Sequence, residues 1–323
     1  MPVITHPHDL LEASVFVDVE PIVGRPLQLK VEGFNFAGSV KLRTAAGLVE
    51  AAEAEGRLVE GSVVIESSSG NLGLAIGVIA ASRGIPFVCV TDPRCNPTTL
   101  RLLRAIGAEA VVVSEPDRNG GYLESRLRHV RATCAADDRY VWLNQYANPA
   151  NWLAHYELTA PEIAKQHPDL DVLFVGAGTG GTLMGCARYF RDNGDRVKVV
   201  GVDAIGSVSF GGPSGPRYIP GLGSSVAPPL LDPSLLGGVV HVPEPETVRW
   251  CRELASHGFL FGGSTGTVVG GAVRWLNEHD PQGALRAVAI APDLADRYVD
   301  TIYDDVWVAE HFGDIQTRGR DVA

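Results

Sequence analysis

One lysine of this chain occurs where a lysine is least expected. The 323 residues include only four lysines, and Lys41 follows Gly38 and Ser39 at the start of a helical pattern. Ser39 is a candidate N-cap, so Lys41 should lie in the first helical turn, where the helix dipole disfavours a cation and lowers its pKa. Imine-forming nucleophiles require a lysine of lowered pKa. Lys41 is therefore a candidate nucleophile, with a solvated surface lysine as the alternative.

The other three lysines have ordinary surface explanations. Lys30 alternates with polar neighbours in "LQLKVE" and should face solvent. Lys165 is near the end of a predicted helix, where a cation is favoured, and Lys198 opens a strand after a charged loop. Chemistry is therefore assigned first to Lys41.

Three segments share the order apolar strand, small-residue turn and helix. They are residues 65–75, 175–185 and 259–271, with the sequences "IESSSGNLGLA", "VGAGTGGTLMG" and "FLFGGSTGTVVGG". Such a turn leaves backbone N–H groups unpaired at a helix N-terminus, where the dipole adds partial positive charge. Each turn is a candidate anion site, and tight packing is the alternative interpretation of each one alone.

The elements that must position these turns alternate along most of the chain. Apolar runs such as "SVVIES", "FVCVTD" and "DVLFVG" are each followed by a helical pattern. Continuous Val, Ile and Leu runs joined by crossover helices are typical of buried parallel strands, so an α/β chain is predicted. Residues 15–33 instead predict two antiparallel strands. Residues 210–229, rich in Gly, Pro and Ser, predict a long functional or mobile loop.

Composition excludes several classes of function. The net charge is −11 and no Lys/Arg block occurs, which argues against a nucleic-acid partner. No apolar run of 18 residues is uninterrupted, so no membrane span is expected. The five cysteines form no CxxC pair, so neither a disulfide framework nor a metal site is expected. The N-terminus lacks the pattern of a secretory signal, and we expect a cytoplasmic protein.

A dinucleotide-binding interpretation also fits one of the turns. "GAGTGG" satisfies G-x-G-x-x-G at Gly176, Gly178 and Gly181, and Asp203 follows at the end of the next strand. An NAD-dependent Rossmann oxidoreductase is therefore an alternative. It leaves Lys41 and the other two turns unexplained.

Taken together, these residues resemble the cysteine-synthase group of fold-type II pyridoxal-phosphate (PLP) enzymes. "GSVK" is similar to the Schiff-base turn of that family, "SSSGNLG" to its substrate-carboxylate loop and "GTGGT" to its cofactor-phosphate loop. "GGSTG" is similar to the segment whose serine meets the pyridine nitrogen. The four occur in the family's order, and the resemblance covers about residues 15–310. It implies a tryptophan synthase β-like fold of two open, mostly parallel sheet domains with PLP between them.

The resemblance assigns the cofactor contacts residue by residue. Lys41 would be the catalytic lysine that bears pyridoxal 5′-phosphate, Asn71 would contact the ring hydroxyl, and Ser264 would face the pyridine nitrogen. The residues that would bind the 5′-phosphate are Gly178, Thr179, Gly180, Gly181 and Thr182. No metal is implied.

The substrate contacts follow from the same resemblance and a narrower one. Ser68, Ser69 and Gly70 would hold the substrate α-carboxylate. Arg126, on a predicted helix, could bind a carboxylate of the incoming nucleophile bidentately, and Tyr146 would assist it. The alternatives are a solvated helix residue for Arg126 and a core aromatic for Tyr146.

That narrower resemblance is to the N-(2-amino-2-carboxyethyl)-L-glutamate synthases of staphyloferrin B biosynthesis. The segments that carry it are "DRNGGYLESRL", "WLNQYANPANWLAHY", "VDAIGSVSFG", "IPGLGSS" and "PDLADRYVDTIYDDVW". It implies PLP-dependent β-replacement on O-phospho-L-serine with L-glutamate as the amine, toward 2,3-diaminopropionate for a siderophore or peptide antibiotic. The alternatives are a cysteine synthase, which would take O-acetylserine or O-phosphoserine and sulfide, and a catalytically silent binding protein.

The resemblance also implies the domain organisation. Residues 39–140 would form a small mobile domain that carries the Schiff-base lysine and the carboxylate loop. Residues 1–38 and 141–323 would form a large PLP-binding domain. A homodimer is implied as well, with small amino acids as its only other partners.

Overall fold

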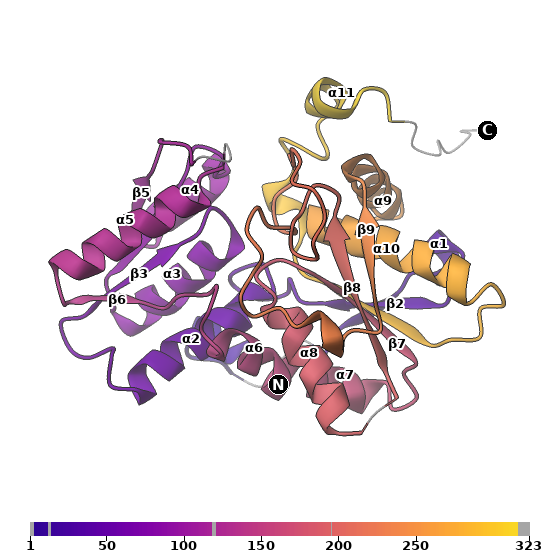
Figure 1. The fold of residues 1–323 in the computed structure, drawn as a ribbon, viewed down its shortest axis with the longest axis horizontal. Helices are drawn as coiled ribbons and strands as arrows, with labels where there is room; N and C mark the ends of the chain where they lie inside the picture. Colours follow the sequence, from indigo (N-terminus) through magenta and orange to yellow (C-terminus); the bar gives the residue numbers. More distant parts are fainter. Residues whose placement is uncertain (1–2, 12–13, 118–120, 195, 316–323) are drawn as a thin grey trace.

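The apolar strands form two open sheets, which lie in two lobes of the molecule, and helices connect the strands (Figure 1). This computed structural model describes residues 3–11, 14–117, 121–194 and 196–315. The strand order is β5-β4-β3-β6 in one sheet and β1-β2-β10-β7-β8-β9 in the other. Among these strands only the pairing of β1 with β2 is antiparallel. The predicted α/β class and its mostly parallel sheets are confirmed.

The four-stranded sheet is packed on both faces. Val64 belongs to the apolar cluster that includes α2 and α3, whereas its neighbour Ile65 packs with Val130 of α5. The strands are β3 (Val63–Ser67), β4 (Phe87–Thr91), β5 (Glu109–Val112) and β6 (Tyr140–Trp142). The helices are α2 (Lys41–Ala54), α3 (Asn71–Arg83), α4 (Pro97–Ala105) and α5 (Leu123–Ala136).

The six-stranded sheet draws on both ends of the chain. Its strands are β1 (Phe16–Asp18), β2 (Leu27–Val31), β7 (Val172–Gly176), β8 (Lys198–Ala204), β9 (Gly238–Val242) and β10 (Ala287–Ala291). The helices of this lobe are α1 (Glu20–Val23), α6 (Ala150–Ala154), α7 (Ala160–Gln166), α8 (Gly181–Asp192), α9 (Glu244–Ser256), α10 (Gly263–His279) and α11 (Asp305–Phe312). Short helical turns are η1 (Pro7–Asp9), η3 (Pro233–Leu235), η4 (Ala295–Arg297) and the π-helix η2 (His155–Thr159).

Strand β10 shows why this sheet needs helices on both faces. Ala287, Ala289 and Ala291 belong to the cluster that includes α10, whereas Val288 and Ile290 belong to the cluster that includes α8. Successive side chains of a strand point to opposite faces, so a run of five apolar residues supplies two cores.

Two expectations about the chain between these elements can be compared with the structure. The antiparallel pair predicted at residues 15–33 is confirmed, with Phe16 opposite Lys30. Residues 210–229 contain no helix or strand, as their composition predicts. Strand β6 begins at residue 140, the predicted end of the small domain, and completes the four-stranded sheet. The domain boundary near residue 140 stays a prediction.

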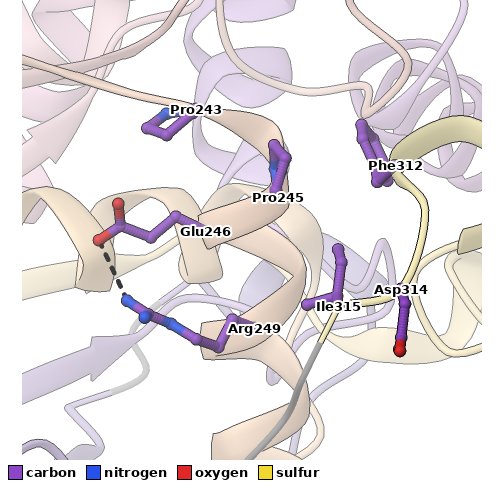
Figure 2. Close-up of a pocket in the computed structure, with 7 residues that line it drawn as sticks. All are labelled: Pro243, Pro245, Glu246, Arg249, Phe312, Asp314 and Ile315. Atoms are coloured by element: carbon purple, nitrogen blue, oxygen red, sulfur yellow. Dashed lines mark ion pairs between the residues drawn. The ribbon is translucent and has the colours of Figure 1, made fainter.

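A hollow of about 330 Å³ lies between the start of α9 and the residues after α11 (Figure 2). It is lined by Pro243, Pro245, Glu246, Arg249, Phe312, Asp314 and Ile315. None of the site residues predicted from the sequence borders it. Within the described residues, no helix has the length and apolar character needed to cross a membrane.

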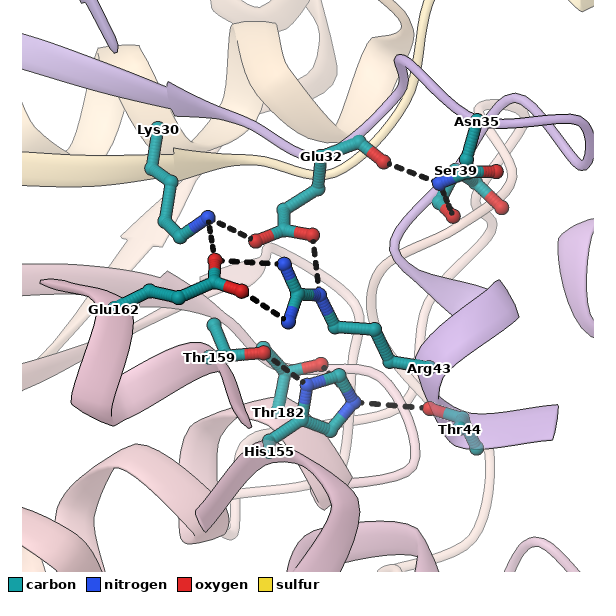
Figure 3. Close-up of polar contacts among 10 residues, drawn as sticks. All are labelled: Lys30, Glu32, Asn35, Ser39, Arg43, Thr44, His155, Thr159, Glu162 and Thr182. Carbon is teal, nitrogen blue, oxygen red and sulfur yellow. Dashed lines mark hydrogen bonds and ion pairs between the residues drawn. The ribbon is translucent and has the colours of Figure 1, made fainter. Parts of the chain in front are cut away.

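The expectation that Lys30 faces solvent is wrong. Lys30 is fully buried, and its Nζ lies 2.7 Å from Glu32 Oε1 and 2.7 Å from Glu162 Oε2 (Figure 3). The guanidinium of Arg43 completes the group, with Nε 2.9 Å from Glu32 Oε2 and Nη2 2.7 Å from Glu162 Oε2. Strand β2 is an interior strand with both faces covered, so its alternation of polar residues does not mark a solvent face.

These four residues, which we call the buried ion quartet, tie three elements together. Lys30 and Glu32 come from β2 and the residue after it, Arg43 from α2 and Glu162 from α7. Two cations and two carboxylates cancel, which allows all four to be buried. The quartet thereby fixes the start of α2 against the six-stranded sheet.

We predict that Lys30→Met lowers the free energy of unfolding by about 3–5 kcal/mol, because both carboxylates of the quartet lose a cation while they stay largely buried. Urea unfolding followed by circular dichroism measures the change. Lys165→Met, at an exposed position on α7, is the control and should change the stability by less than about 0.5 kcal/mol. Equal effects of the two substitutions would contradict this account of the quartet.

Candidate active site

Lys41 is the first residue of α2, as the sequence predicts, but the cap before it differs from the prediction. The N-cap is Val40, which makes no side-chain cap bond. The hydroxyl of Ser39 is buried without a hydrogen-bond partner, so Ser39 is not the N-cap. Burial of the ammonium lowers the pKa of Lys41 to about 8. Desolvation, rather than the helix dipole, is thus the cause of the lowered pKa.

Within the described chain, Lys41 forms no ion pair, in contrast to the two quartet cations near it. Arg43 lies two residues further along α2 and is paired with two carboxylates. An amine without a counter-ion gains less from being protonated. Lys41 therefore has the environment of a nucleophile or a proton carrier.

His155 connects α2 to the first turn of α8. Its Nε2 lies 2.9 Å from Thr44 Oγ1 and 3.2 Å from Thr182 Oγ1, and its Nδ1 lies 2.9 Å from Thr159 Oγ1 (Figure 3). Burial, reinforced by the charge of Lys41, lowers the pKa of His155 well below its ordinary value. The imidazole is thus neutral and joins the lysine helix to residues 178–182. Sequence reasoning assigned His155 no role.

Residues 178–182, the predicted phosphate loop, form an open set of hydrogen-bond donors. Among the described residues, none of the five backbone N–H groups from 178 to 182 donates to the protein. Gly180 has φ +91°, and a Cβ on Gly181 would overlap the side chain of Asn151, so these two positions require glycine. Five free donors at the N-terminus of α8 match the demand of a phosphate dianion.

The predicted carboxylate loop before α3 has a different arrangement. The Oγ of Ser68 accepts the N–H groups of Gly70, at 3.3 Å, and Gly73, at 3.0 Å. Within the described chain, the N–H groups of Ser69 and Asn71 have no partner. Ser68 shapes the loop, whereas Ser69 and the start of α3 offer free donors.

Ser264 lies close to the phosphate loop through a turn of the long loop 210–229. A Cβ on Gly221 would overlap Ser264 Oγ, and the Gly221 carbonyl oxygen lies 3.1 Å from the position that a Cβ of Gly178 would take. The backbone of Gly221 therefore separates Ser264 from Gly178. This long loop, predicted to be functional or mobile, borders both of these predicted cofactor contacts.

Tyr146 contacts the carboxylate loop at Ser67, and Arg126 lies close enough for its charge to act on Tyr146. Arg126 is only 7 % exposed, so the solvated alternative is wrong, and its Nε lies 3.3 Å from Asp92 Oδ2. Its Nε and Nη1 have no hydrogen-bond partner. The hydroxyl of Tyr146 donates to the carbonyl of Ser67 at 3.3 Å. Burial raises the pKa of Tyr146, and the charge of Arg126 opposes that shift. Residues 118–120 of "DRNGGYLESRL" lie outside the described residues.

Glu66, at the end of β3, is a buried acid that the sequence did not single out. Its carboxylate accepts the N–H of Ser67 at 2.8 Å, the indole N–H of Trp142 at 3.1 Å and the N–H of Gln145 at 3.2 Å. Burial outweighs these bonds and raises the pKa of Glu66 to about 7. The residue directly before the carboxylate loop is therefore a buried acid whose pKa lies near neutral pH.

The carboxylate that the dinucleotide interpretation requires is not open to a ligand. Asp203 is fully buried, and its Oδ1 accepts the N–H of Ala204 at 2.8 Å.

Among the described residues, no group of three or more His, Cys, Asp or Glu side chains is placed to hold a metal ion.

We predict a distinctive pH profile for reductive methylation of Lys41 by formaldehyde and cyanoborohydride in the cofactor-free protein. The rate should rise about tenfold per pH unit and level off above about pH 8, because the neutral amine reacts and its pKa is lowered to about 8. Peptide mass spectrometry measures the rate, with the peptide that contains the exposed Lys165 as the internal reference. A Lys41 rate that shows no plateau near pH 8 would refute the assignment of a low pKa to Lys41.

Glu66→Gln should change how stability depends on pH. Because the folded protein holds the Glu66 proton more tightly than the unfolded chain, its contribution is present below the ordinary pKa of 4.5 and is lost as the pH rises through about 7. The wild-type stability should fall relative to that of the variant by about 3 kcal/mol over this range. Urea unfolding at several pH values measures it, with the exposed Glu60→Gln as control. Parallel curves for Glu66→Gln and wild type would contradict the raised pKa.

Comparison with known proteins places this geometry in a family. Residues 15–293 match the family model described as "Pyridoxal-phosphate dependent enzyme". Two curated relatives named N-(2-amino-2-carboxyethyl)-L-glutamate synthase, from Ralstonia nicotianae and Cupriavidus metallidurans, are 42 % and 43 % identical to this chain. Each match covers 87 % of this chain and 83 % of the relative.

Two solved structures show the same architecture. An O-acetylserine dependent cystathionine beta-synthase from Helicobacter pylori aligns with a TM-score of 0.85 at 28 % identity, over 94 % of this chain and 100 % of its own. A hydrogen sulfide-producing enzyme from Fusobacterium nucleatum aligns with a TM-score of 0.84 at 28 % identity, over 92 % and 100 %. The unpaired lysine and the open glycine loop fit this group, and the chain belongs to the fold-type II pyridoxal-phosphate dependent enzymes.

Proposed function

We propose that this enzyme catalyses β-replacement on O-phospho-L-serine with L-glutamate as the amine, and releases N-(2-amino-2-carboxyethyl)-L-glutamate and phosphate. The observation that carries the proposal is the identity of 42–43 % to two relatives that bear this name, over most of both chains. We also propose that the product leads to 2,3-diaminopropionate for a siderophore or peptide antibiotic, and that the enzyme is a cytoplasmic homodimer.

The residues present fit the cofactor. The five free N–H groups of residues 178–182 would hold the 5′-phosphate, with the hydroxyls of Thr179 and Thr182 beside them. Lys41 would bear the cofactor, Asn71 would contact the ring hydroxyl, and Ser264 would face the ring nitrogen. When bound, PLP supplies an electron sink for the negative charge that forms at the substrate Cα. A neutral serine hydroxyl beside the nitrogen moderates that sink, which favours elimination over transamination.

Lys41 would move the proton at the substrate Cα. Its lowered pKa leaves a useful fraction of the amine neutral near pH 7, so it can remove this proton and later return it. The free N–H groups of Ser69 and Asn71, with Gly70 between them, would bind the substrate α-carboxylate at the start of α3. We assign Ser68 to the same carboxylate site, through the loop that its hydroxyl shapes.

Arg126 would distinguish an amino-acid nucleophile from sulfide. Its guanidinium is buried, with Nε 3.3 Å from Asp92 Oδ2, and two of its nitrogen atoms lack hydrogen-bond partners. A carboxylate of L-glutamate would satisfy those donors, with Tyr146 beside it, whereas sulfide offers no comparable acceptor. The buried arginine thus supports the proposed reaction over a cysteine synthase.

We further propose that residues 39–140 move as a small domain over the substrate. The four-stranded sheet and α2 supply Lys41 and the carboxylate loop, whereas the six-stranded sheet supplies residues 178–182 and Ser264. The buried ion quartet and His155 already tie α2 to the six-stranded lobe, so the start of α2 would be the hinge of this motion. Closure over the bound substrate would exclude water from the reacting carbon.

The test is product analysis with the purified holoenzyme. We predict release of phosphate from O-phospho-L-serine that depends on L-glutamate, with the adduct identified by mass spectrometry. Lys41→Ala should abolish turnover, because the variant lacks the amine that we propose moves the Cα proton. Production of cysteine from sulfide with O-acetylserine, without any glutamate adduct, would overturn the proposal.

Arg126→Met should raise the KM for glutamate by about tenfold or more and change kcat less, since the lost bond is to a bound carboxylate. Arg128→Met, at an exposed position on the same helix, is the matched control and should leave both constants near their wild-type values. An unchanged KM in the Arg126 variant would remove Arg126 from the glutamate site.

A further inference from the structure

Asp293, two residues after β10, is a buried acid to which the proposed reaction assigns no role. It is fully buried, and its backbone is held by two of the predicted cofactor segments. Its carbonyl accepts the N–H of Gly262 at 3.0 Å, and it forms an isolated β-bridge with Ser39. The preceding carbonyl, of Pro292, accepts the N–H of Val40 at 2.7 Å. Asp293 therefore lies between the turn before Lys41 and the turn before Ser264.

The side chain of Asp293 contacts a third predicted cofactor segment, the one that carries Asn71. Its Oδ2 accepts the amide Nδ2 of Asn71 at 2.8 Å and the hydroxyl of Tyr298 at 2.6 Å. A carboxylate can only accept hydrogen bonds, whereas an asparagine amide has one donor end and one acceptor end. Asp293 therefore dictates which end of Asn71 points toward it, and so which groups of the amide remain for a ligand.

Tyr298 extends this contact toward Ser264. The hydroxyls of Tyr298 and Ser264 both lie close to Gly221. A Cβ built on Gly221 would be 3.7 Å from Tyr298 Oη and would overlap Ser264 Oγ. Because Tyr298 Oη donates to Asp293, the carboxylate lies in a chain of contacts from Asn71 to the surroundings of Ser264. Burial raises the pKa of Asp293, while the two donors oppose the shift.

We propose that Asp293 is a positioning residue for the cofactor ring: it fixes the amide of Asn71 toward the ring hydroxyl and, through Tyr298, couples Asn71 to the turn that carries Ser264. This inference rests on the proposed roles of Asn71 and Ser264. It does not depend on the identity of the two substrates. The alternative is that Asp293 only clamps the two lobes together.

The experiment compares two cofactors in the full-length protein. Wild type, Asp293→Asn and Asn71→Ala are freed of cofactor and titrated with PLP or with its 3-deoxy analogue, which lacks the ring hydroxyl. We expect Asp293→Asn to weaken PLP binding by about tenfold and to leave binding of the analogue unchanged within about twofold. A double variant that combines Asp293→Asn with Asn71→Ala is titrated as well. Its affinity for PLP should be no lower than that of Asn71→Ala alone, because both residues act through one contact.

Asp203→Asn is the matched control. Asp203 is equally buried and also has one carboxylate oxygen without a partner, but the bond it makes is to Ala204. It should not change the preference for PLP over the analogue. The absorbance maximum of bound PLP, which depends on the ring hydroxyl, should shift in the Asp293 variant and not in the Asp203 variant. If Asp293→Asn does not fold, Asp293→Ser, which cannot reach both donors, replaces it.

Equal weakening of both cofactors by the Asp293 variant would reduce Asp293 to a structural clamp and overturn the proposal. Equal binding of PLP and the analogue by the wild type would overturn it as well, by removing Asn71 from the ring hydroxyl. Turnover of O-phospho-L-serine with L-glutamate is measured separately on the wild type, so failure of the proposed reaction is distinguishable from either result.

Discussion

An amine held in a buried site without a counter-ion is the constraint on which the rest of this site depends. Charged groups are expensive to bury, and the chain buries several of them within a few residues of Lys41. Arg43 is matched by two carboxylates, and burial keeps His155 neutral among three threonine hydroxyls. Lys41 has no such counter-ion among the described residues, and burial lowers its pKa.

The same contrast between satisfied and unsatisfied groups separates the loops of the site. Ser68 satisfies part of the carboxylate loop from within, which gives the loop a fixed shape. Among the described residues, the backbone N–H groups of residues 178–182 have no such internal partner and are open to a ligand. The first loop thus holds its own geometry, whereas the second leaves its donors free for an anion.

Local pattern was sufficient to predict the strands β3 and β7 and the turns that follow them, because continuous apolar runs and small-residue turns depend on nearby residues. The strand predicted before the third turn is absent, since Phe261 forms only an isolated β-bridge with Leu294. The environments of single polar residues were harder. Lys30 pairs with Glu162 of α7, which is far away in sequence, and Asp293 meets Asn71 across 222 residues. His155 and Glu66 carry no local signal, since a buried histidine or glutamate within an apolar stretch is informative only when its partners are known. The family resemblance supplied the expected cofactor contacts, and the contacts behind them required the structure.

The position of β10 bears on how the molecule is made. The strand order β1-β2-β10-β7-β8-β9 places β10, the last strand of the described residues, between β2, close to the N-terminus, and β7. During synthesis the hairpin of β1 and β2 has no neighbour to pair with until residues 287–291 leave the ribosome. The four-stranded sheet, drawn entirely from residues 63–142, has no such delay. The order of synthesis thus favours assembly of the lysine-bearing lobe first, and the wait of β2 for β10 makes the larger sheet a late, long-range event in folding.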